Sequence, residues 1–197
     1  MSHIYVVVGK SSTGKDTLFQ MLASDFDLSL KTLVGYTTRP IRDGEKEGLQ
    51  YHFVSKDRLE QLKKEKLVIH HCAYNTAHGI WDYFTVNDGQ IDLTKKCDYI
   101  ITGTIESFCQ IRDYFGKDTV IPLYIEVETG ERMQRALNRE RKQEQPKYIE
   151  MCRRFIADEE DFTEDNIEKA EIRVRYHNDD LNHCYQEIKN SILLHKE

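Results

Sequence analysis

The most distinctive chemical pattern in the sequence is a short glycine-bounded segment, residues 9–15, whose letters GKSSTGK fit the spacing G-x-x-x-x-G-K. An apolar, β-branched run (4–8) comes directly before it, and apolar residues at helical spacing follow it over 15–26. Between a buried strand and a helix N-terminus, such a loop can point successive backbone N–H groups at a phosphate. The pattern therefore predicts a site for the phosphates of ATP, with Lys15 reaching the β- and γ-phosphate oxygens. The predicted ATP-binding residues are Gly9, Ser11, Ser12, Thr13, Gly14, Lys15, Asp16 and Thr17.

The loop departs from the usual pattern at one position, because Asp16 stands after the lysine where Ser or Thr is usual, and Thr17 follows it. A hydroxyl group at this place normally ligates Mg²⁺. A carboxylate is also a hard oxygen ligand that suits Mg²⁺. We therefore expect Mg²⁺ to be held by Asp16, directly or through water, or by Thr17.

A second pattern comprises residues 36–45 (YTTRPIRDGE) and 51–53 (YHF). Two arginines three apart beside a turn, Arg39 and Arg42, can form a bidentate clamp for a second phosphate, and Tyr51 offers a hydroxyl donor. In this segment the chain resembles the guanylate kinase family, which carries T-T-R-x-x-R-x-G-E…Y-H-F at this distance after its phosphate loop.

The resemblance extends over nearly the whole chain. Arg135 and Arg139 have the R-x-x-x-R spacing of the family's lid, and Arg154 falls where the family has another phosphate-contacting arginine. Residues 178–181 (NDDL) look like the family's N-D-D-L. The resemblance implies a kinase that transfers the γ-phosphoryl group of ATP to a nucleoside monophosphate similar to GMP. Such a transfer requires mainly the positioning of the two substrates and the neutralisation of their negative charge. The catalytic residues that it implies are Lys15, Arg135, Arg139 and Arg154, and the substrate-binding residues are Thr38, Arg39, Arg42, Tyr51 and Gly79.

The segment that reads guanine in the family, F-I-E…N-Y-Y-G-T, is different here. Gly79 is kept, but Ile69 stands near the expected glutamate and Ile80 replaces the hydroxyl residue. The family's L-D-I-D aspartates are replaced by residues 101–104 (ITGT). Guanine N–H donors without partners would cost binding free energy. The GKD-type loop is also similar to that of ribose 1,5-bisphosphate phosphokinases. A phosphorylated sugar as acceptor, or a guanylate-kinase-like binding module, therefore stays open.

The order of elements favours one α/β domain over residues 1–197. The resemblance specifies a P-loop NTPase fold with a parallel sheet core (about 1–34 and 95–197), a small acceptor-binding insert (about 35–94) and a helical lid (about 132–155). Strands are expected at 4–8, 32–37, 51–54, 67–71, 97–102, 120–127 and 172–176. Helices are expected at 15–26, 56–66, 105–115, 129–143, 148–162 and 181–194.

Composition limits the remaining possibilities. The net charge of −6 does not favour a nucleic-acid partner, and the sequence shows no signal peptide or membrane span. Five scattered cysteines without CxxC spacing predict reduced thiols and a cytoplasmic protein. We also expect the protein to be a monomer or a homodimer. The cluster His70, His71, Cys72 and His78 is interpreted as acceptor contacts or surface, not as a zinc site. The acidic run 158–161 is interpreted as a solvated helix face.

Overall fold

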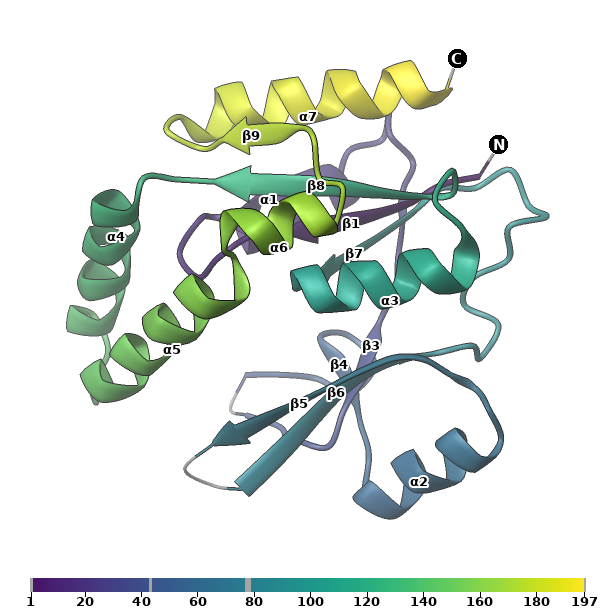
Figure 1. Ribbon diagram of the computed structural model, residues 1–197, viewed down its shortest axis with the longest axis horizontal. Helices are drawn as coiled ribbons and strands as arrows, with labels where there is room; N and C mark the ends of the chain where they lie inside the picture. Colours follow the sequence, from purple (N-terminus) through teal and green to yellow (C-terminus); the bar gives the residue numbers. More distant parts are fainter. Residues whose placement is uncertain (1, 43, 77–78, 197) are drawn as a thin grey trace.

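The computed structural model describes residues 2–42, 44–76 and 79–196, and its centre is a sheet of five parallel strands (Figure 1). Their order is β2-β7-β1-β8-β9, and each neighbouring pair is parallel. The strands are Ile4–Val8 (β1), Lys31–Thr32 (β2), Tyr99–Gly103 (β7), Val120–Glu126 (β8) and Arg175–His177 (β9). Their carboxyl ends therefore share one edge, and β1 runs into the glycine loop there.

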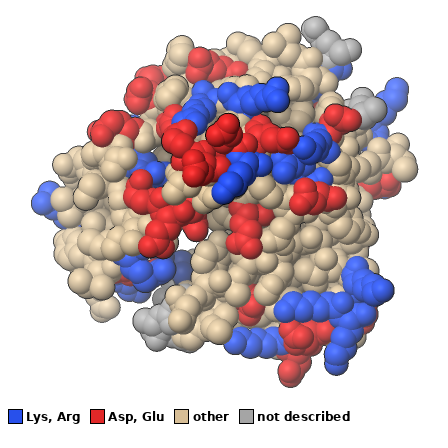
Figure 2. All heavy atoms as spheres, in the orientation of Figure 1, with Lys and Arg blue, Asp and Glu red and all other residues tan. Residues whose placement is uncertain are grey.

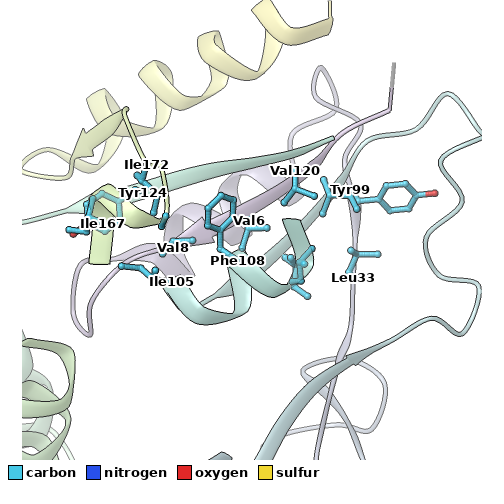
Figure 3. Packing of buried hydrophobic residues seen from close by; sticks show 14 of the residues in the cluster. Val6, Val8, Leu33, Tyr99, Ile105, Phe108, Val120, Tyr124, Ile167 and Ile172 are labelled. Atoms are coloured by element: carbon cyan, nitrogen blue, oxygen red, sulfur yellow. The ribbon is translucent and has the colours of Figure 1, made fainter. Parts of the chain in front are cut away.

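Helices cover both faces of this sheet, and β1 shows why its sequence is continuously apolar. Val6 and Val8 pack with Phe108 on one face (Figure 3), while Tyr5 and Val7 join a second cluster on the other face. A strand buried on both faces has no position for a polar side chain. One face is covered by Ile105–Phe115 (α3) and Glu164–Lys169 (α6), and the other by Lys15–Ala23 (α1) and Leu181–Lys196 (α7).

A second sheet of four strands lies below the core in Figure 1, and we call it the acceptor sheet. Its order is β4-β3-β6-β5, with β3 and β4 parallel and the other pairs antiparallel. The strands are Gly35–Thr37 (β3), Tyr51–Phe53 (β4), Val68–Thr76 (β5) and Gly79–Val86 (β6). Lys56–Lys64 (α2) buries Leu59 and Leu62 against Phe84 and Val86 of this sheet.

Two helices, Thr129–Arg141 (α4) and Tyr148–Asp161 (α5), stand beside the carboxyl edge of the core sheet (Figure 1). We call this pair the lid helices. Arg132 joins them, because its fully buried guanidinium lies 4.4 Å from the Phe155 ring centroid and 3.1 Å from Glu159. Every residue of α5 keeps some solvent exposure, so this helix is held by few contacts.

The α/β class and the parallel core are confirmed, and two of the expected strands differ in detail. The strand expected at 32–37 is divided, because Lys31–Thr32 pairs in the core sheet and Gly35–Thr37 in the acceptor sheet. The last strand is Arg175–His177, not 172–176, since Ile172 packs into the core cluster before the strand begins. The sequence analysis did not predict β6 or α6. The boundaries of the insert and the lid stay predictions.

Candidate active site

The glycine loop has a backbone that its glycines make possible. Gly14 has φ +85°, and Ser12 also lies in the left-handed region, with φ 64°. A Cβ at Gly9 would approach the Ile125 carbonyl oxygen to 2.7 Å, and one at Gly14 would approach the Asn178 amide nitrogen to 2.4 Å. Neither position therefore has room for a larger residue, and the loop is packed tightly against β8 and the segment after β9.

Asn178, from the NDDL segment, fastens this loop from behind. The buried side-chain amide of Asn178 donates to the Thr13 backbone carbonyl at 2.7 Å, and the backbone carbonyl of Asn178 accepts from Arg135 Nη2 at 3.0 Å. The same residue thus joins the phosphate loop to the first lid helix. The weak sequence match at 178–181 therefore corresponds to a structural tie between the two candidate ATP-binding regions.

Asp16 is open to solvent at the end of the loop, while Lys15 is half-buried. Lys15 begins α1, and its ammonium group lies 3.6 Å from Asp16 Oδ1. The Asp16 side chain is 83% exposed, and Thr17 is exposed as well. Hard oxygens in this position, beside a lysine at a helix N-terminus, fit a Mg²⁺ ion that would accompany the phosphates.

Carboxylates from the second lid helix lie on the loop. The Ser11 backbone N–H donates to Asp158 Oδ2 at 2.8 Å, and Lys10 Nζ donates to Glu159 Oε2 at 2.8 Å. The interpretation of residues 158–161 as a solvated helix face is therefore wrong for Asp158, which is half-buried, whereas Glu159 is exposed although it pairs with Lys10. Helical spacing within α5 could not reveal this contact, because it depends on how the lid helices fold back onto the loop.

In the acceptor sheet, Arg39 is tightly bound within the protein. Its guanidinium is 3% exposed and donates to both Glu45 oxygens, at 2.9 and 2.8 Å. This pair holds the pKa of Glu45 below its ordinary value. The guanidinium also lies 5.7 Å from the ring centroid of Tyr51 and 5.4 Å from that of Phe53. Arg39 can therefore bind a phosphate only if Glu45 gives up one or both of its hydrogen bonds to the guanidinium.

The remaining predicted acceptor residues surround Arg39. Arg42 is exposed, and its guanidinium lies 5.9 Å from the Trp81 ring centroid. Tyr51 is half-buried, which raises the pKa of its hydroxyl, and the charge of Asp16 adds to that rise. Tyr51 thus lies within electrostatic reach of the phosphate loop. Gly79 opens β6 with φ +101°.

Thr38 is part of a polar group on the acceptor sheet that the sequence analysis missed. Its hydroxyl donates to Asp82 Oδ2 at 2.9 Å, and His71 Nε2 lies 2.8 Å from Asp82 Oδ1. Burial alone would raise the pKa of Asp82, but the hydrogen bonds from His71 and Thr38 hold it below its ordinary value. No sequence signal links these residues, because they meet only through strand pairing.

Two of the three lid arginines form ion pairs within their own helices. Arg135 donates to Glu131 at 2.9 Å, and Arg139 is exposed further along α4. Arg154 donates to Glu150 at 3.1 Å, and together with Arg153 it lowers the pKa of Glu150 to about 2, with Arg153 the larger cause. The structure thus connects Arg135 to Asn178 behind the phosphate loop, while Arg139 and Arg154 lie at exposed positions on the lid helices.

The expected guanine-reading positions are apolar here. Ile69 is 8% exposed and belongs to the core cluster, so it packs between the two sheets instead of presenting a polar group. Ile80 is exposed.

Of the histidine and cysteine cluster, His78 lies outside the described residues, and the described residues contain no group of three or more metal-ligating side chains. Within the described part of the chain, no helix combines the length and apolar character needed to cross a membrane.

Comparisons with known proteins agree with this architecture. The family model described as guanylate kinase matches residues 1–195. The guanylate kinase of Neisseria meningitidis serogroup A is 33% identical over 112 residues, which are 56% of this chain and 52% of that protein. The guanylate kinase of Schizosaccharomyces pombe is 44% identical over 61 residues, 31% of this chain and 30% of that protein. The chain thus spans about half the length, or less, of these curated relatives.

A solved structure shares the fold over almost the full chain. The guanylate kinase from Anaplasma phagocytophilum superimposes with a TM-score of 0.66 at 17% identity, covering 99% of this chain and 86% of that one. The fold is thus shared with a solved guanylate kinase, and the family model matches residues 1–195 of the chain. This chain belongs to the guanylate kinase family.

Proposed function

We propose that this chain is an ATP-dependent kinase that transfers the γ-phosphoryl group of ATP to GMP. The observation that carries the proposal is the intact phosphate loop, in which Gly9 and Gly14 have no room for a side chain and Lys15 stands at the N-terminus of α1. A loop that had lost phosphate binding would not need these two close approaches. The family match supports GMP as the acceptor.

The residues divide the work between two phosphate-binding ends. Backbone N–H groups from Ser11 to Asp16 and the Lys15 ammonium hold the β- and γ-phosphates of ATP. Arg42 and the Tyr51 hydroxyl, with Arg39 once Glu45 shares it, hold the phosphate of GMP. Burial raises the pKa of the Tyr51 hydroxyl and the charge of Asp16 adds to that rise, which supports placing the two ends in one site. Transfer then needs mainly positioning and neutralisation of negative charge.

The lid arginines complete the site when the lid closes. Arg135 already reaches the segment behind the phosphate loop through Asn178. Closure would bring Arg139 and Arg154 toward the transferring group, where their positive charges offset the negative charge of the transition state. The closed lid would also exclude water from the site. The Glu150 ion pair must open for Arg154 to take this role.

Asp16 and Thr17 would hold Mg²⁺, the ion that the family implies. When bound, the ion neutralises charge on the β- and γ-phosphate oxygens. The exposed Asp16 carboxylate can bind it directly or through a water molecule. We further expect a cytoplasmic protein, monomeric or homodimeric, without nucleic-acid or membrane partners.

The comparisons do not support the two alternatives considered from the sequence, a ribose 1,5-bisphosphate phosphokinase and a binding module without catalysis. A coupled assay of ATP consumption with Mg²⁺ tests the proposal against GMP, dGMP, AMP, CMP, UMP, dTMP and ribose 1,5-bisphosphate. We expect turnover with GMP to exceed turnover with every other acceptor. Preference for the sugar, or ATP binding without turnover on any acceptor, would overturn it.

A further inference from the structure

Three tyrosines form a row on the acceptor sheet that begins at the phosphate end. The ring centroid of Tyr51 lies 5.6 Å from that of Tyr83, which lies 5.7 Å from that of Tyr74, and both contacts are edge-to-face. Tyr83 also interacts with the guanidinium of Arg39. The row thus starts at the predicted acceptor phosphate clamp and continues along β5 and β6 toward α3.

The far end of the row meets the first turn of α3. Burial raises the pKa of the Tyr74 hydroxyl, and an interaction with the Thr104 side chain opposes that shift. Burial also raises the pKa of the neighbouring Cys72 thiol to about 12, and the Glu106 carboxylate, which interacts with the thiol, adds to that rise. Thr104 and Glu106 therefore face the acceptor sheet from the core.

A glutamine holds the Glu106 carboxylate in place. Gln110 Nε2 donates to Glu106 Oε1 at 3.1 Å, and Gln110 Oε1 accepts from the His71 backbone N–H at 3.0 Å. The side chain of Gln110 thus connects β5 to Glu106 across the junction between the core and the acceptor sheet. Thr104 is held as well, since it caps α3 by accepting from the Ser107 N–H at 3.2 Å. Both groups are fixed before a ligand arrives.

The surroundings favour a ligand that donates hydrogen bonds. Glu106 is exposed, and on the side of α6 it borders an open cavity of about 290 Å³ that Asp161 and Lys169 also line. Burial raises the pKa of Asp161, and the charges of Asp158 and Glu106 raise it further, so negative charge is in excess at this place. Figure 2 shows this face hollowed between the lid and the acceptor sheet, with acidic side chains above the hollow. A base that offers N–H groups would relieve this excess.

We propose that the base of the acceptor nucleotide lies against Tyr83 and Tyr74 and that Glu106 recognises it by accepting hydrogen bonds from the ring N1–H and the 2-amino group of guanine. This inference rests on the proposed function and assigns the base-reading group of the same site. The carboxylate comes from the first turn of α3, while Ile69 on β5 is buried in the core cluster. Tyrosine rings offer a flat apolar surface, and the carboxylate accepts two parallel N–H donors.

The charge of Glu106 also excludes other bases. Adenine presents a lone pair at N1 where guanine presents a donor, so a carboxylate facing this edge repels it. IMP keeps the N1–H but lacks the 2-amino group, so it would keep one of the two hydrogen bonds. The expected order of kcat/KM is therefore GMP, then IMP, then AMP.

The test compares Glu106→Gln with Asp113→Asn, which removes the same charge from an exposed position near the other end of α3. We expect Glu106→Gln to raise the KM for GMP by roughly 10- to 100-fold, as for the loss of one charge-assisted hydrogen bond. The KM for ATP should not change. The GMP:AMP ratio of kcat/KM should also fall, because an amide can donate to N1 of adenine. Asp113→Asn should match the wild type in all three values.

Binding without catalysis gives an independent reading. Trp81 is the single tryptophan and pairs with Tyr74 in the β5–β6 register, so its fluorescence is expected to report GMP binding in the absence of ATP. The dissociation constant from this titration should rise with the KM in Glu106→Gln. If wild-type protein turns over GMP and Glu106→Gln keeps its KM and base preference within about twofold, this inference is wrong and the kinase stands. If wild-type protein neither binds nor phosphorylates GMP, the proposed function itself fails.

Discussion

The phosphate loop and the acceptor sheet are built differently for the phosphate binding that we propose for each. The loop uses backbone N–H groups held by a local chain conformation, with Gly14 at φ +85° and Asn178 behind it. The acceptor sheet offers side chains from separate elements, such as Tyr51 of β4 and Arg39 after β3, whose guanidinium lies 5.7 Å from the Tyr51 ring centroid. A backbone site depends on a few contiguous residues, whereas a side-chain site can be rebuilt from other positions. This difference explains how the chain keeps its loop while the expected guanine-reading residues are replaced.

The largest effect is expected for Lys15→Ala, which removes a ligand contact from the phosphate loop. Turnover should fall by roughly 10²–10³-fold or more, because the ammonium group offsets charge on the transferring phosphoryl group. Folding should not change, since Lys15 is not part of either core cluster. Steady-state kinetics and thermal unfolding measure the two quantities. A variant that lost its folded state would show that the loop is structural and would remove the contrast with the acceptor sheet.

An intermediate effect concerns the acceptor sheet and the pH dependence of its stability. His70 is buried between Thr85 and Cys72, at 3.3 Å from each, and burial lowers its pKa to about 4. The folded protein keeps this histidine neutral, while the unfolded chain binds a proton near pH 6.5. The stabilisation is therefore present above about pH 6.5 and is lost as the pH falls toward 4, by up to about 3 kcal/mol.

Denaturant unfolding of His70→Gln and of the wild type between pH 7 and 4 measures this pH-dependent part of the free energy of unfolding. The variant should lose less stability than the wild type on acidification, and His183→Gln, at an exposed position, should follow the wild type. If the free energy of unfolding changed with pH equally in the wild type and in His70→Gln, His70 would not be a buried, neutral histidine. ATP binding should not change in either variant, because the phosphate loop contains no histidine.

The smallest effect is expected where the lid helices contact the loop. Asp158 accepts from the Ser11 N–H at 2.8 Å, so a triphosphate and this carboxylate compete for the same electropositive loop. Asp158→Asn should bind ATP roughly three- to tenfold more tightly, since one like charge is removed. Glu160→Gln, an exposed position on the same helix, should show no change. Weaker ATP binding in Asp158→Asn, measured by calorimetry, would instead mean that the carboxylate supports the loop.

Several features of the protein followed from local sequence alone. The loop at residues 9–15 was recognisable because the strand, the glycines, the lysine and the helix are contiguous, and the apolar run 4–8 required burial on both faces. Residues 36–45 were recognisable by their resemblance to the family motif, since they too are contiguous. Periodicity also identified most helices. Short-range physics decides these features, so a short window of sequence contains them.

The tertiary structure decided the rest. It divided residues 32–37 between two sheets, placed Asp158 on the phosphate loop, and connected Glu106 of α3 to β5 through Gln110. Each of these contacts joins residues that are distant in sequence or belong to different sheets. Strand pairing and helix docking are selected by burial over the whole molecule, and no local pattern encodes which side chains they bring together.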